Sequence, residues 1–186
     1  MFTMDGQTSM LLAVIVVLAL IAVAAWTFHQ RQQSHRLEHR FGTEYSRTVE
    51  NLGSRTKAEA ELKSREKRVG LLSIVPLPPE DAARFKESWK QLQVRFVDDP
   101  KGAVTEADRV VRDLMERRGY PMGDFEQRAA DVSVDHPAVV ENYRAAQDIA
   151  ARNQRGEADT EALRQAVVYY RALFEDLLEV KGEQSR

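Results

Sequence analysis

The feature that most constrains this sequence is an uncharged, apolar run of nineteen residues from Met10 to Phe28. A helix rises about 1.5 Å per residue, so a run of this length reaches roughly 28 Å, close to the ~30 Å hydrocarbon thickness of a bilayer. The run therefore predicts a transmembrane helix over residues 10–28, preceded by a short tail over residues 1–9. Trp26 and Phe28 stand at its end, just before histidine and arginine residues, as aromatic side chains do at a membrane interface.

A cleaved export signal is the alternative interpretation of the same run. A signal peptide begins with positive charge and combines a shorter apolar stretch with a small-x-small cleavage site. Residues 1–9 contain no lysine or arginine, which argues against a signal, whereas residues 22–24, Ala-Val-Ala, fit the cleavage pattern. We expect an uncleaved anchor, and an exported domain, tethered outside or released by cleavage, stays as the alternative.

The charges on the two sides of the run predict its orientation. No lysine or arginine precedes the run in this sequence, and four arginines follow it within twenty residues: Arg31, Arg36, Arg40 and Arg47. Because positively charged flanking segments stay in the cytoplasm, we expect the N-terminus outside and the C-terminal domain in the cytoplasm. The same arginines can contact anionic lipid headgroups, at about 1 kcal/mol for each cation near the surface.

Composition divides the rest of the chain into a basic and an acidic part. Residues 29–68 carry ten lysines and arginines against six acids, whereas residues 69–186 carry seventeen against twenty-two. The basic part is rich in helix formers and poor in large apolar residues, which predicts a helical stalk over residues 29–70. Residues 71–79, LLSIVPLPP, have three prolines in their last four positions, which predicts an extended strap lying on the next domain.

Apolar residues at helical spacing predict a bundle of four to five helices over residues 80–180. The first stripe consists of Phe85, Trp89, Leu92 and Phe96. No alternation typical of strands is present, so the predicted fold class is all-α, with an N-terminal transmembrane helix, a charged helical stalk and then the bundle.

Two helix starts and one tail are specific expectations. One helix is expected to begin near Asp135, with Pro137 in its first turn. The last helix, beginning at Asp159 or Thr160, has the widest apolar stripe and is expected to be central to the bundle. Residues 181–186 are expected to form a disordered tail.

Few residues carry catalytic or metal-binding chemistry. The sequence contains no cysteine, so disulfides, thiolate ligands and cysteine nucleophiles are excluded. His35 and His39 share a helix face but lack an obvious third metal ligand, and Asp135 beside His136 is better explained as a helix cap than as an acid–base pair. Glycine-rich phosphate loops, zinc-protease helices and nucleophile elbows are absent. We therefore expect a protein that is not an enzyme, with no catalytic residue, cofactor or metal site, and the acidic distal part argues against nucleic-acid binding.

Five segments between Arg40 and Leu178 carry a family resemblance: RFGTEYSRTVE, KAEAEL, RFVDDP, DFEQRAADVSVDHPAVVENYRAA and GEADTEALRQAVVYYRALFEDLL. Together they resemble a family of uncharacterised bacterial single-pass membrane proteins. The resemblance implies a bacterial source and a stable helical domain, and it assigns no activity and no site residue. The combined prediction is a non-enzymatic interaction or scaffold protein of the bacterial inner membrane, whose partners are the lipid bilayer and an unidentified protein.

Overall fold

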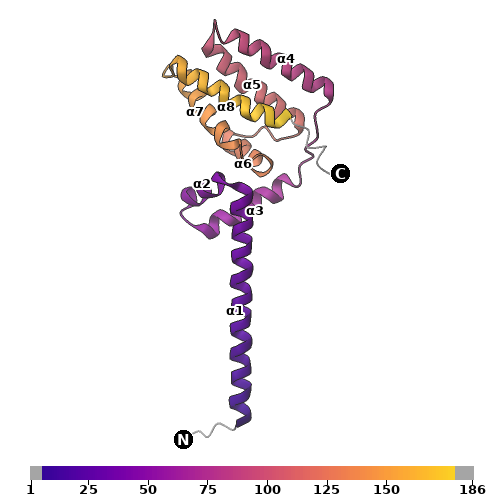
Figure 1. Cartoon of the computed structure of the whole chain (residues 1–186), viewed down its shortest axis with the longest axis vertical. Coiled ribbons are helices and arrows are strands. Elements are labelled where there is room, and N and C mark those ends of the chain that lie inside the picture. The colour runs from indigo at the N-terminus through magenta and orange to yellow at the C-terminus, as the bar shows by residue number, and fades with distance from the viewer. Residues whose placement is uncertain (1–5, 179–186) are drawn as a thin grey trace. The chain divides into compact units, whose positions relative to one another are not determined.

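The computed structural model describes residues 6–178, except for the side chains of residues 6–13, 26, 29 and 30. In this part of the chain every regular element is a helix and there is no strand, so the predicted all-α class is confirmed (Figure 1). The helices are α1 (Gly6–Phe41), α2 (Thr43–Leu52), α3 (Arg55–Val69), α4 (Pro79–Arg95), α5 (Pro100–Arg118), α6 (Phe125–Asp135), α7 (Val140–Gln154) and α8 (Thr160–Leu178).

The chain forms two compact units, and the division between them falls inside α1, between His39 and Arg40. Among the described side chains, no helix combines the length and the apolarity that a membrane crossing needs. The predicted transmembrane segment lies partly on side chains outside the description, those of residues 10–13 and 26, and it stays a prediction. The predicted disordered tail over residues 181–186 and the first five residues of the predicted N-terminal tail also lie outside the described residues.

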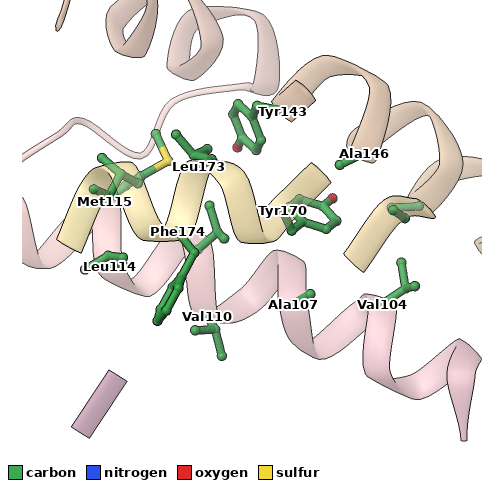
Figure 2. Close-up of a cluster of buried hydrophobic side chains, with 14 of the residues drawn as sticks. Val104, Ala107, Val110, Leu114, Met115, Tyr143, Ala146, Tyr170, Leu173 and Phe174 are labelled. Atoms are coloured by element: carbon green, nitrogen blue, oxygen red, sulfur yellow. The ribbon is translucent and has the colours of Figure 1, made fainter. Parts of the chain in front are cut away.

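The core of the second unit, residues 40–178, lies where α8 packs along both α5 and α7 (Figure 2). Tyr170 and Leu173 of α8 are fully buried in this core, and Tyr170 meets Tyr143 of α7 edge to face with ring centroids 6.3 Å apart. Leu114 and Met115 of α5 are equally buried. These contacts agree with the central position expected for the last helix, and helices α4–α8 make up the helical bundle.

Helix α4 covers the core by inserting one large aromatic side chain. Trp89 is 5% exposed and stacks on Phe174 of α8, with ring centroids 4.5 Å apart and an angle of 20° between the rings. Leu92 is buried beside it, whereas Phe85 and Phe96 are only partly buried. The predicted apolar stripe therefore does face the core, and its two middle residues are the ones that fill it.

The extended segment between α3 and α4 lies against the C-terminal end of α5. The Val75 N–H donates a hydrogen bond to the Arg118 carbonyl oxygen at 2.9 Å, and Leu77 is buried in the core. Gly119 has a φ of +95°, and a Cβ at this position would lie 2.6 Å from the Ser73 carbonyl oxygen. Glycine is thus required both by the left-handed backbone and by the close approach of the strap.

The expected helix start near Asp135 is wrong. Helix α6 runs through Asp135, and α7 begins only at Val140, so Pro137 lies in the turn between them rather than in a first helical turn. Helix α6 continues through Asp135 to its C-cap at His136, whose N–H donates to the Val132 carbonyl oxygen at 2.8 Å, and the Asp135 carboxylate accepts a hydrogen bond from the Tyr120 hydroxyl at 3.1 Å.

The region predicted as a stalk contains α2 and α3, which pack against each other and reach α7 and α6. Gly42, with a φ of +52°, separates α1 from α2. Ser54 caps the start of α3 by accepting a hydrogen bond from the Lys57 N–H.

Candidate functional site

The membrane-proximal residues predicted from the sequence are found in both units. Arg31 and Arg36 are exposed in the first unit, as is Phe28, and the Trp26 side chain lies outside the description. Their predicted roles at a membrane surface stay predictions.

The two arginines in the second unit have different surroundings. Arg40 forms an ion pair with Glu66 of α3, with 3.1 Å between its Nη1 and the Glu66 Oε1. Arg47 is exposed on α2 and lines a groove. The charge of Arg40 is therefore partly neutralised within the domain, whereas that of Arg47 faces outward.

A groove of about 760 Å³ lies between α2 on one side and α6 and α7 on the other. Its apolar lining includes Phe125 of α6 and two alanines of α7. Five carboxylates and two arginines line it, so the lining carries a formal net charge of −3. The charged residues are Glu44, Arg47, Glu50, Glu126, Glu141, Arg144 and Asp148.

A network of ion pairs joins the two sides of this groove. Glu44 of α2 is 3% exposed, and it accepts hydrogen bonds from Arg65 Nη1 at 2.9 Å and from Arg144 Nη2 at 3.0 Å. Arg144 also donates to Glu126 of α6 at 2.6 Å, and Arg65 donates to Glu61 at 3.0 Å. The network thus connects α2, α3, α6 and α7, and its three central charges, those of Glu44, Arg65 and Arg144, are largely removed from water.

The ionic state of Arg144 is set by two opposing effects. Burial works against its positive charge, but the hydrogen bonds to Glu44 and Glu126 outweigh this and raise the pKa of Arg144. The guanidinium therefore stays charged and serves as a structural cation inside the groove wall.

Three other acids of the groove are exposed: Glu50 on α2, and Glu141 and Asp148 on α7. No described residue forms a hydrogen bond or an ion pair with any of their three carboxylates. Glu141 and Asp148 are seven residues apart, which places them on the same side of α7 at a separation of roughly 10 Å along its axis. The groove therefore presents carboxylates that no internal cation neutralises.

A second polar cluster surrounds His136, in the turn after α6. The His136 imidazole is 4% exposed, and its Nδ1 is hydrogen-bonded to the Asp176 carboxylate of α8. Burial lowers the pKa of His136, although Asp176 acts in the opposite direction. The His136 Nε2 is buried without a hydrogen-bond partner among the described residues. The neighbouring Arg118 donates to the Leu177 carbonyl oxygen at 2.9 Å.

A histidine held by a carboxylate has the geometry of a general base, but His136 does not line the groove between α2 and α7. Its interaction with Asp176 instead ties the end of α6 to α8. The sequence pattern predicts no such pair, because the two residues are forty positions apart and belong to different helices.

A smaller apolar surface lies between α4 and α8. A hollow of about 160 Å³ is lined by Phe96, Val167 and Val168. Val94 and Val97, which are not part of its lining, are 68% and 82% exposed. Single exposed apolar side chains are normal on protein surfaces, and only a larger contiguous patch marks an interaction site. These few residues therefore do not define one.

The fold and the groove define a helical-bundle protein with an acidic surface groove. Neither a protein-family model, nor a curated protein sequence, nor a solved structure matches the chain.

Proposed function

We propose that this chain is a membrane-anchored, non-enzymatic interaction protein, in which α1 holds the helical domain at a bilayer surface and the domain binds a protein partner. The observation that carries the anchor is the exposure of consecutive apolar side chains on α1. Between residues 14 and 23 the large apolar side chains are 48–64% exposed on all sides of the helix. A helix that is apolar all round is normally covered, either by a protein core or by lipid. A bilayer provides that cover at about 25 cal/mol for each Å² of apolar surface removed from water.

The proposed orientation has the N-terminus outside and the domain in the cytoplasm of a bacterium. Its support is the charge bias across the apolar segment, which has no lysine or arginine before it in this sequence. Arg31, Arg36, Arg40 and Arg47 follow the segment within twenty residues and supply the positive side of this bias.

A binding role, rather than catalysis, is supported by how the buried ionisable groups are used. Glu44 pairs with Arg65 and Arg144, Asp131 pairs with Arg68 at 2.8 Å, and each of these pairs joins two helices. Charged groups paired in this way hold helices together.

Fusions of the full chain to a reporter test the proposal. A C-terminal fluorescent protein is expected to fluoresce in the membrane fraction and to resist carbonate extraction, whereas a C-terminal alkaline phosphatase is expected to be inactive. The Leu18→Arg/Ile21→Arg variant should release the fluorescent fusion into the soluble fraction, because two charges at the centre of a span cost several kcal/mol. The matched Val94→Arg/Val97→Arg variant changes the same net charge outside α1 and should leave fractionation unchanged.

Two results contradict the proposal in different ways. Extraction of the wild-type chain by carbonate would show that α1 is not an anchor. An active phosphatase fusion would reverse the orientation and favour the alternative, an exported envelope domain. In that case a mature chain beginning at Ala25 would identify cleavage after residues 22–24.

A further inference from the structure

We infer that the groove between α2 and α6–α7 is the binding site for the protein partner, and that the partner inserts a cationic, amphipathic helical segment into it. The inference deepens the proposed function and rests on it for the existence of a partner. It does not depend on the membrane anchor.

The shape and the apolar lining of the groove suit a polypeptide segment. Its volume of about 760 Å³ lies between an elongated wall made by α7 and a second wall made by α2. Phe125, Ala145 and Ala151 give it apolar surface that is only partly buried. An amphipathic helix covers such a surface with its apolar face and leaves its polar face at the rims.

The charge of the groove selects a cationic partner. Glu44 and Glu126 are paired with Arg65 and Arg144 inside the domain, and Arg65 also pairs with Glu61. The surplus consists of three exposed carboxylates, of Glu50, Glu141 and Asp148, against Arg47 as the only further cation of the lining. An anionic headgroup or phosphorylated segment would be repelled, whereas lysine and arginine side chains would find acceptors on both rims.

The spacing of the carboxylates distinguishes a helical segment from a small cation. Glu141 and Asp148 are separated by roughly 10 Å along α7, which is too far for one metal ion to bind both. A helix lying along α7 presents residues at i and i+7 with the same separation, so two of its cations can meet these two acids. A metal ion or a simple amine would also leave the apolar surface uncovered.

The test measures binding of a defined peptide to the full chain in a non-ionic detergent. The probe is a fluorescein-labelled helical peptide of about eighteen residues, roughly five turns, with lysines on one face and alanine and leucine on the other. A second probe has glutamate in place of every lysine. Fluorescence anisotropy is expected to show saturable binding of the lysine probe, weaker at high salt than at low salt, and no binding of the glutamate probe.

Two matched triple variants separate the groove from general charge. Glu50→Gln/Glu141→Gln/Asp148→Asn removes the three free carboxylates and is expected to raise the Kd about tenfold or more. Glu80→Gln/Asp98→Asn/Glu116→Gln changes the net charge equally at three exposed acids outside the groove, and it should change the Kd by less than about twofold. Circular dichroism checks that both variants fold.

A third variant tests the shape of the groove with its charges intact. Ala145→Trp places a large side chain in the lining and should weaken binding of the lysine probe. The inference is overturned if wild type does not bind the lysine probe, if both triple variants weaken binding equally, or if Ala145→Trp binds as wild type does. Failure of the carbonate extraction would remove the membrane anchor and leave these peptide measurements unaffected, so the two failures are distinguishable.

Discussion

Replacing Glu44 with glutamine is expected to lower the free energy of unfolding by about 3 kcal/mol. Glu44 is 3% exposed, and its carboxylate accepts hydrogen bonds from both Arg65 and Arg144. Removing one partner of a buried ion pair costs about 3–5 kcal/mol, because the remaining charge is left buried and unpaired. Each arginine retains a second carboxylate, that of Glu61 for Arg65 and that of Glu126 for Arg144, so we expect the lower end of this range.

Urea denaturation followed by circular dichroism measures this change, and Glu175→Gln is the control. Glu175 pairs with Arg171 at 2.7 Å, but both side chains are more than half exposed, so its removal should cost about 0.5 kcal/mol or less. Amide hydrogen exchange shows where the destabilisation occurs, because protection should fall more in α2 and α3 than in α5 and α8. A loss below about 1 kcal/mol for Glu44→Gln, or a loss equal to that of the control, would refute the reasoning.

Three further changes test the core, the strap and the buried histidine. Trp89→Ala should cost about 3–5 kcal/mol in urea denaturation, because the indole fills the space beside Phe174, and a cost below about 1 kcal/mol would mean that the ring is not core. Gly119→Ala should cost about 2 kcal/mol or more, from its positive φ and the contact with the Ser73 carbonyl oxygen, and an unchanged midpoint would contradict this. Burial lowers the pKa of His136 in the folded state, so the unfolded chain binds a proton more readily than the folded one. The free energy of unfolding should therefore be unaffected by His136 well above pH about 6.5 and should fall as the pH decreases below that value. In His136→Gln this dependence should become flatter, and an identical slope in the two proteins would refute the assignment.

The spacing of apolar residues predicted the bundle because each of its helices buries one apolar face. Trp89 and Leu92 were placed on a buried face by spacing alone, and the widest stripe correctly indicated that α8 meets two neighbouring helices. The same reasoning failed at Asp135, where α6 continues through the residue that was expected to begin the next helix. Contacts between residues on different helices cannot be predicted from the spacing of residues within one helix.

The groove is the clearest example of a feature that local sequence patterns could not predict. Glu50, Glu141 and Asp148 read in the sequence as ordinary solvated acids, and only folding brings α2 beside α7. Glu44 and Arg144, one hundred positions apart, are paired only in three dimensions. The apolar segment and the charge bias around it are local features of the sequence, and the anchor and direction predicted from them stay predictions.

The position of α8 at the centre of the core also sets an order of events during protein synthesis. Tyr170, Leu173 and Phe174 are among the last described residues to be translated, and the apolar faces of α5 and α7 have no cover until these residues leave the ribosome. At roughly 5–20 residues per second, the interval between the end of α1 and the end of α8 is on the order of ten seconds. An N-terminal segment that is handed to a membrane during translation would thus be inserted before the domain behind it has closed. The direction of insertion must then be decided while that domain is still an open chain.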